Sequence, residues 1–126
     1  MRLLLDTQAA YWWLQENRRL SPRAQRAIAN ARNTTSFSVI AIYEIALKVR
    51  RGLLTDIHAL KFRNGLVADG FSPLALTADH MAKGGLQGWR NKDPWDRLYA
   101  AQAMAEGMML VSIDEAFDEL PLKRLW

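Results

Sequence analysis

Two short apolar runs that each end in an aspartate stand out in the hydrophobic pattern of the chain. "RLLLD" ends at Asp6, and "MMLVSID" ends at Asp114. Nearly unbroken apolar runs of this length are typical of strands buried on both faces, which occur in parallel sheets covered by helices. We therefore predict two central strands of a parallel sheet, each followed by an acid.

The remaining segments alternate between helical and extended patterns. Apolar spacing and start or stop signals predict helices at 7–17, 20–33, 40–52, 55–70, 77–85 and 93–107, with a single helical turn at 115–120. Extended segments are predicted at 34–39, 71–76 and 121–126. Because strands alternate with helices, we expect an α/β fold: a three-layer α/β/α sandwich with a short central parallel sheet, forming a single domain over residues 1–126.

Composition narrows the classes of protein. The 126 residues are 50% hydrophobic and 24% charged and contain no cysteine, which excludes disulfides and Cys-based zinc sites. His58 and His80 lack metal-ligand spacing, so we expect structural or surface roles. The N-terminal leucines are too few for a signal peptide, and no run reaches membrane-spanning length. We therefore expect a cytoplasmic protein that does not enter the membrane.

The net charge of the chain gives a weak indication of its binding partner. A net charge of +4 and a pI near 9.8 favour a polyanionic partner such as nucleic acid. A soluble protein with surplus lysine and arginine explains the same charge equally well.

Asp6 and Asp114 should emerge at the same edge of the sheet. Ligand sites in open parallel sheets lie outside the carboxyl ends of the strands. For either residue taken alone, capping of the following helix is an equally good explanation.

Glu44 lies in "VIAIYEIALKV", a helix that is apolar on nearly every side, as in buried helices. A buried carboxylate is costly unless it is paired or binds a metal. The alternative is an ion pair with Lys48, but an exposed pair of this kind contributes only ~0.3–0.5 kcal/mol. That energy does not offset burial, so we predict a functional role for Glu44.

The stretch "KDPWDRLYAAQA" contains two aspartates at the start of a helix. Asp93 precedes a proline suited to the first helical position, so we predict that it caps the helix. Asp96 then lies in the first turn, and the stripe formed by Trp95, Leu98 and Tyr99 packs the helix down. The alternative role for Asp96, compensation of the helix dipole, contributes ~0.3–1 kcal/mol. We predict that Asp96 is directed toward the strand ends.

Four carboxylates would then meet: Asp6, Glu44, Asp96 and Asp114. Carboxylates that crowd together repel each other, and their pKa values rise unless a cation compensates. Ligands that are all oxygen select Mg²⁺ or Mn²⁺, which bind substrate phosphate and activate water. Together with the basic charge, this pattern indicates a metal-dependent nuclease.

These segments resemble a known family. The chain is similar to PIN domains, specifically to VapC-type toxin ribonucleases of bacterial toxin–antitoxin pairs. The resembling segments extend over almost the whole chain: "LLLDT", "YEIALKVRRGLL", "DPWDRLYAAQAMAEG", "LVSIDEAF" and "LKRLW". The family's acidic cluster falls on the same four residues.

The resemblance implies Mg²⁺- or Mn²⁺-dependent cleavage of RNA, a homodimer, and a cognate VapB-like antitoxin that blocks the site, often with a basic side chain. The chain departs from the family at Gln8 and in the loop at Asn91 and Lys92, where histidine often occurs, and at Trp95, where phenylalanine is usual. These departures leave the acids intact and concern substrate contacts.

The mechanistic hypothesis gives each residue a role. Asp6, Asp96 and Asp114 would hold the metal, directly or through water, and Glu44 would share it or orient the attacking water. Thr7 and Ser112 would supply supporting hydrogen bonds, although Ser112 also fits an ordinary hydroxyl at a strand end. Candidate phosphate contacts, for which solvated surface is the alternative, are Lys48, Arg50, Arg51, Lys92 and Arg97.

Two functions from other classes remain open. A receiver-type phosphoacceptor domain also holds Mg²⁺ with acids, but it expects adjacent acids after the first strand and a late lysine followed by proline. Here Asp6 stands alone, and Lys123 is followed by Arg124. The other alternative is a catalytically silent module that binds RNA or an antitoxin.

Overall fold

A parallel sheet of five strands forms the centre of the molecule, which is described by a computed structural model covering residues 1–126. The strands are β1 (Arg2–Leu5), β2 (Thr34–Ser38), β3 (Ser72–Leu74), β4 (Met109–Val111) and β5 (Arg124–Leu125). They lie in the order β3-β2-β1-β4-β5, and every neighbouring pair is parallel. Receiver-type domains have the order 2-1-3-4-5, so this topology argues against that alternative.

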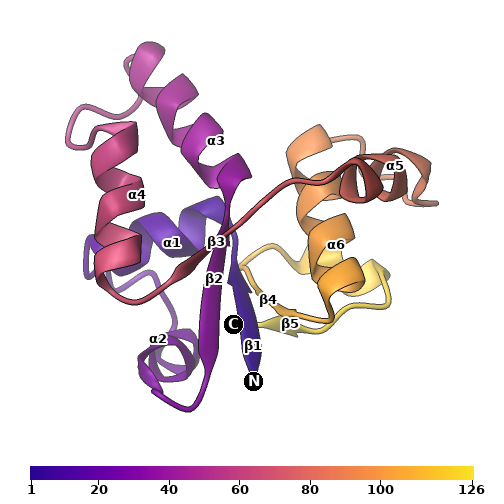
Figure 1. Ribbon diagram of the computed structural model, residues 1–126, viewed down its shortest axis with the longest axis horizontal. Helices are drawn as coiled ribbons and strands as arrows, with labels where there is room; N and C mark the ends of the chain where they lie inside the picture. Colours follow the sequence, from indigo (N-terminus) through magenta and orange to yellow (C-terminus); the bar gives the residue numbers. More distant parts are fainter.

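Helices cover both faces of the sheet (Figure 1). They are α1 (Thr7–Leu14), α2 (Pro22–Ala29), α3 (Val39–Arg50), α4 (Ala59–Ala68), α5 (Ala78–Leu86) and α6 (Pro94–Glu106), with a 3₁₀ helix η1 (Glu115–Glu119). In this view α1, α2 and α4 lie on one side of the sheet, α5 and α6 lie on the other, and α3 rises from the end of β2. The predicted α/β/α sandwich is confirmed. None of these helices is long and apolar enough to cross a membrane.

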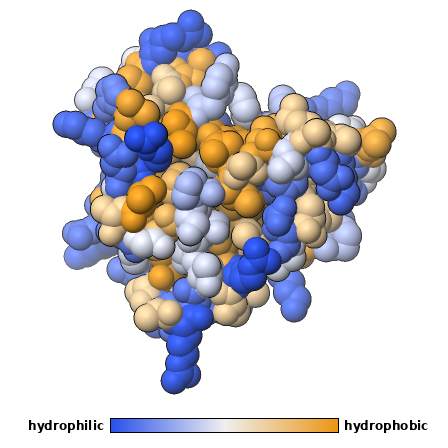
Figure 2. All heavy atoms as spheres, in the orientation of Figure 1, coloured by the Kyte–Doolittle hydropathy of each residue, from blue (hydrophilic) through white to orange (hydrophobic).

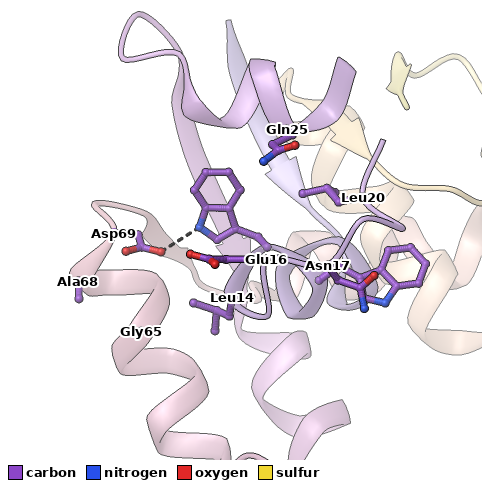
Figure 3. A pocket seen from close by; sticks show the side chains of 10 residues that line it. Leu14, Glu16, Asn17, Leu20, Gln25, Gly65, Ala68 and Asp69 are labelled. Carbon is purple, nitrogen blue, oxygen red and sulfur yellow. Dashed lines mark hydrogen bonds between the residues drawn. The ribbon is translucent and has the colours of Figure 1, made fainter. Parts of the chain in front are cut away.

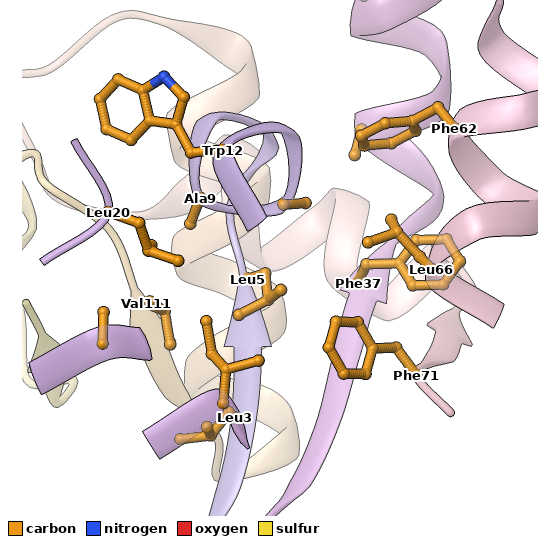
Figure 4. Packing of buried hydrophobic residues seen from close by; sticks show 14 of the residues in the cluster. Leu3, Leu5, Ala9, Trp12, Leu20, Phe37, Phe62, Leu66, Phe71 and Val111 are labelled. Atoms are coloured by element: carbon orange, nitrogen blue, oxygen red, sulfur yellow. The ribbon is translucent and has the colours of Figure 1, made fainter. Parts of the chain in front are cut away.

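The two faces of the sheet bury separate hydrophobic clusters. Leu3 and Leu5 of β1 pack into the cluster beneath α1, α2 and α4, where Phe37 and Phe62 are fully buried (Figure 4). Leu4 points to the opposite face and joins residues of α6. All three leucines are inaccessible to solvent, as the unbroken apolar run predicts.

Helix boundaries follow the capping signals in the sequence. The Ser21 hydroxyl accepts a hydrogen bond from the backbone N–H of Ala24 (3.1 Å), and Gly107 ends α6 with φ of 62°. Helix α4 begins later than predicted, because His58 caps it through Nδ1. Thr77 caps α5, and His80 completes the capping box because its Nδ1 accepts from the Thr77 N–H (3.1 Å). His80 Nε2 also lies 2.8 Å from Glu106, so both histidines have structural roles, as expected.

The burial of side chains in α3 and α6 is not what the hydrophobic pattern alone indicates. Helix α3 is not buried all round, because Tyr43 and Arg50 are exposed along it. Figure 2 shows apolar residues gathered in the upper part of the molecule, where α3 lies. In α6, Gln102 is fully buried, and its amide Nε2 donates to the carbonyl of Ala75 (3.3 Å). Because α3 is partly exposed, burying the Glu44 carboxylate costs less free energy than it would in a helix enclosed on all sides.

Candidate active site

Asp6 and Asp114 lie where the strand order reverses. From β1, the chain continues to β2 and β3 on one side, whereas β4 and β5 pair on the other. Leu5 is opposite Val111, and the backbone N–H of Asp6 donates to the carbonyl of Val111 (3.1 Å). Ligand sites of parallel sheets form at such a reversal.

Both aspartates also cap helices. Asp6 Oδ1 accepts from the N–H of Ala9 at the start of α1 (2.8 Å), and Asp114 Oδ1 accepts from the N–H of Ala116 at the start of η1 (2.9 Å). The capping explanation is therefore correct for each residue. Each cap uses one oxygen of its carboxylate, so capping does not prevent the second oxygen from binding a ligand.

Glu44 extends from α3 and is only partly buried. Its carboxylate Oε1 accepts a hydrogen bond from the Thr7 hydroxyl (2.6 Å), so Thr7 supports Glu44 directly. Lys48 makes no direct ion pair with Glu44. Burial raises the pKa of the Glu44 carboxyl, and the positive charge of Lys48 only partly offsets this rise. The ion-pair alternative for Glu44 is therefore not supported.

Asp96 extends from the first turn of α6. Asp93 caps this helix as predicted, because its Oδ1 accepts from the N–H of Trp95 (2.9 Å). Asn91 Nδ2 donates to Asp96 Oδ2 (3.0 Å), so the preceding loop holds the side chain of Asp96. The rings of Trp95 and Tyr43 lie 5.2 Å apart and connect α6 with α3.

Burial and like charges raise the pKa values of three acids. The pKa of Asp6 rises from 3.8 to about 6, mainly because the carboxyl is buried and also because Glu44 and Asp96 repel it. Hydrogen bonds from the Ser112 hydroxyl and the Ala9 N–H partly oppose this rise. Charged forms of these carboxylates are thus destabilised in the protein alone.

The same effect extends to the other two acids. Burial raises the pKa of Glu44, and the charges of Asp93 and Asp96 raise it further. Burial also raises the pKa of Asp96, to which repulsion from Asp93 and Asp114 contributes. All four predicted acids are therefore within electrostatic reach of at least one other, and Asp93 adds a fifth negative charge.

The carboxylates do not converge tightly on one point. No group of three or more Asp, Glu or His side chains is arranged closely enough to hold a metal ion by itself. The donor set nevertheless suits Mg²⁺, which usually keeps several waters and binds through one or two carboxylates. The raised pKa values of Asp6, Glu44 and Asp96 show that their negative charges are poorly compensated, and a bound cation would stabilise those charges.

Arg97 requires a correction. All five N–H donors of its guanidinium bind backbone carbonyls in the last turn of α5 and in the loop before α6: Gly84 (3.0 Å), Trp89 (2.9 Å), Asn91 (2.8 Å), Gly85 (3.4 Å) and Gln87. No donor is left for a phosphate. Arg97 therefore holds the loop in place, and these hydrogen bonds argue against the predicted contact of Arg97 with RNA phosphate.

The other four basic residues that were predicted to contact phosphate lie at or near the surface. Arg50, Arg51 and Lys92 are exposed, and Lys48 is partly exposed. Lys92 directly precedes Asp93, whereas the arginines lie at the end of α3. This exposure suits both a phosphate contact and a solvated surface.

Ser112 connects the two strand-end acids. It is fully buried, its Oγ accepts from the N–H of Asp114 (3.1 Å), and its hydroxyl lowers the pKa of Asp6. Sequence reasoning missed Asn91 as a partner of Asp96. It also took Tyr99 only as packing, although the phenol oxygen of Tyr99 lies 2.7 Å from Thr7 Oγ1. The spacing of Tyr99, three residues after Asp96, was the available signal, because such residues share a helix face.

The acids lie outside the main hollow on the surface. A hollow of about 630 Å³ lies between the end of α1, α2 and α4, and none of the four acids lines it (Figure 3). Trp13 Nε1 donates there to Asp69 Oδ2 (2.9 Å), and Glu16 extends beside them. Cavity size therefore does not mark the candidate site, which is defined by its carboxylates.

Comparisons with a family model and with a known protein point to the same family. The sequence pattern of the PIN domain matches residues 3–123. Ribonuclease VapC22 of Mycobacterium tuberculosis is 31% identical over 117 residues, which cover 89% of this chain and 86% of that protein.

Solved structures share the fold. A toxin–antitoxin complex from Klebsiella pneumoniae matches with a TM-score of 0.70 and 18% identity, covering 98% of this chain and 96% of the other. VapBC2 from Rickettsia felis, bound to a DNA fragment from its promoter, matches with a TM-score of 0.69 and 19% identity, covering 100% and 99%. The chain therefore belongs to the PIN domain family and, within it, to the VapC type.

Proposed function

We propose that this protein is a Mg²⁺- or Mn²⁺-dependent endoribonuclease toxin of a toxin–antitoxin pair, with residues 1–126 forming one PIN-like nuclease domain. The observation that carries the proposal is the group of carboxylates beside the strand reversal, whose pKa values burial and mutual repulsion raise. Similarity to a protein named as a VapC ribonuclease supports RNA as the substrate.

Asp6, Asp96 and Asp114 would hold the metal, directly or through water, and Glu44 would share it or orient the attacking water. A bound divalent cation would lower the pKa of a water and stabilise charge on the phosphodiester. Asn91 holds Asp96 in place through its amide, and Ser112 links Asp6 with Asp114. The chain's own residues thus fix the acids before any ligand binds.

RNA would approach over the basic residues that remain exposed. We assign phosphate contacts to Lys48, Arg50, Arg51 and Lys92, and exclude Arg97. A VapB-like antitoxin is the expected partner, since a similarly folded chain occurs in a toxin–antitoxin complex. We further propose a homodimer that acts in the cytoplasm.

The decisive test replaces single acids. Asp6→Asn and Asp96→Asn should each abolish metal-dependent RNA cleavage and any growth arrest, because each removes one negative ligand while keeping the shape of the side chain. Asp79→Asn is the matched control, since Asp79 forms only an exposed ion pair with Lys83. Cleavage of single-stranded RNA is followed with purified protein in Mg²⁺ or Mn²⁺.

Two outcomes contradict the proposal. Full activity in either acid variant would reject the site. RNA binding by the wild-type protein without cleavage in either metal would instead support the silent binding module.

A further inference from the structure

Tyr99 places a hydroxyl group inside an otherwise apolar cluster. Its side chain is 2% exposed and packs with the residues of α6 and the sheet that cover Leu4. A buried hydroxyl is costly unless it forms a hydrogen bond. The phenol oxygen of Tyr99 lies 2.7 Å from Thr7 Oγ1, which is its hydrogen-bond partner.

The direction of this hydrogen bond follows from counting donors. Thr7 has one hydroxyl hydrogen, and Thr7 donates it to Glu44 Oε1 over 2.6 Å. An ionised carboxylate only accepts, so the hydrogen between Tyr99 and Thr7 must come from Tyr99. A directed chain therefore runs from Tyr99 of α6 through Thr7 of α1 to Glu44 of α3.

Glu44 depends on this chain for its orientation. The Thr7 hydroxyl is the one group in the protein that donates a hydrogen bond to its carboxylate. Lys48 contributes charge and no direct contact. Without Tyr99, the Thr7 hydroxyl loses the donor that fixes the direction of its own hydrogen bond.

We propose that Tyr99 is a positioning residue that orients Glu44 through Thr7. This inference rests on the proposed ribonuclease function only for its effect on cleavage, because the hydrogen-bond chain itself can be measured without RNA. Tyr99→Phe removes the hydroxyl and keeps the buried ring, so packing in the cluster is preserved.

The activity test compares four variants. Tyr99→Phe and Thr7→Val should each lower kcat by about 10- to 100-fold, as loss of groups that orient ligands does, with KM for RNA little changed. Thr7→Ser keeps the hydroxyl and should retain most activity. In the Thr7→Val background, Tyr99→Phe should cause no further loss, whereas independent structural effects would multiply.

A second readout avoids RNA and metal. In protein labelled with ¹³C-glutamate, the Glu44 carboxyl resonance, assigned by its absence in Glu44→Gln, should move in Tyr99→Phe and Thr7→Val. Tyr11→Phe is the matched control, since it removes a phenol hydroxyl that binds Asp56 and Gln15 at an exposed position. That variant should leave both kcat and the Glu44 resonance unchanged.

The outcomes separate the two proposals. Unchanged kcat together with an unchanged Glu44 resonance in Tyr99→Phe would overturn the positioning role, as would fold losses in kcat that multiply in the double variant. Absence of cleavage by the wild-type protein would reject the ribonuclease function, and the resonance would then decide the hydrogen-bond chain alone.

Discussion

Asp6 combines a stabilising and a destabilising interaction in one residue. Its carboxylate caps α1, yet its pKa is raised from 3.8 to about 6. The folded protein therefore binds this proton more tightly than the unfolded chain does. The resulting stabilisation is complete below about pH 4 and is lost as the pH rises through 6. A shift of this size corresponds to about 3 kcal/mol.

Replacing Asp6 by Asn should reveal this cost. Asparagine caps a helix as well as aspartate does, so the variant removes the charge and keeps the cap. With divalent cations chelated, Asp6→Asn should be more stable than the wild type at pH 8, and the difference should shrink toward pH 4. Urea denaturation at both pH values measures the free energy of unfolding. A difference independent of pH would contradict the prediction.

Single residues show which parts of the site a sequence can reveal. Asp6 and Asp114 were recognisable because each directly follows an apolar strand. The hydrogen bond between Thr7 and Tyr99 joins positions 92 residues apart, and it depends on where the start of α1 meets α6 at the edge of the sheet. No local pattern encodes such a contact, so the partner of Thr7 emerged only from the folded chain.

At the level of elements, the conformation of the loop before α6 depends on hydrogen bonds from Arg97. The guanidinium binds five backbone carbonyls between Gly84 and Asn91, and Asn91 in turn binds Asp96. A planar group with five donors suits this role, whereas lysine provides only a point charge with three. The position of one candidate metal ligand is thus coupled to the order of the whole loop.

Arg97→Lys should therefore loosen residues 84–91 despite keeping the charge. We expect faster amide hydrogen exchange across this loop and a loss of about 2–4 kcal/mol in the free energy of unfolding, since several partly buried carbonyls lose their partners. Arg90→Lys is the control, because the Arg90 side chain is 87% exposed and binds only Glu119. Unchanged exchange with weaker RNA binding would instead restore the phosphate-contact role.

Most elements could be predicted because their boundaries have local causes. Asp93 caps the helix that the sequence assigned to it, and Ser21 and Thr77 cap the helices predicted at 20–33 and 77–85. Helix α4 was placed too early because its cap is a histidine, which is rarely a start signal. The exposure of α3 was also missed, since an apolar side chain such as Tyr43 can pack against Trp95 at the surface.

At the scale of the whole molecule, the candidate site joins elements from both faces of the sheet. Asp6 precedes α1, and Glu44 extends from α3, whereas Asp96 extends from α6 on the other side (Figure 1). Repulsion among their carboxylates acts against the packing of these elements. A cation bound between them would replace that repulsion with attraction and stabilise the native state as a unit.

Mn²⁺ should therefore raise the melting temperature of the wild-type protein. At a concentration 100 times the dissociation constant, a ligand bound only to the native state contributes about 2.7 kcal/mol. The shift should be larger at pH 8 than at pH 5, because the pKa of Asp6 is about 6 and protons compete with the metal below it. Asp96→Asn should reduce the shift, whereas the surface variant Asp79→Asn should retain it. Differential scanning calorimetry with and without Mn²⁺ measures all three proteins, and equal shifts in them would place metal binding away from these carboxylates.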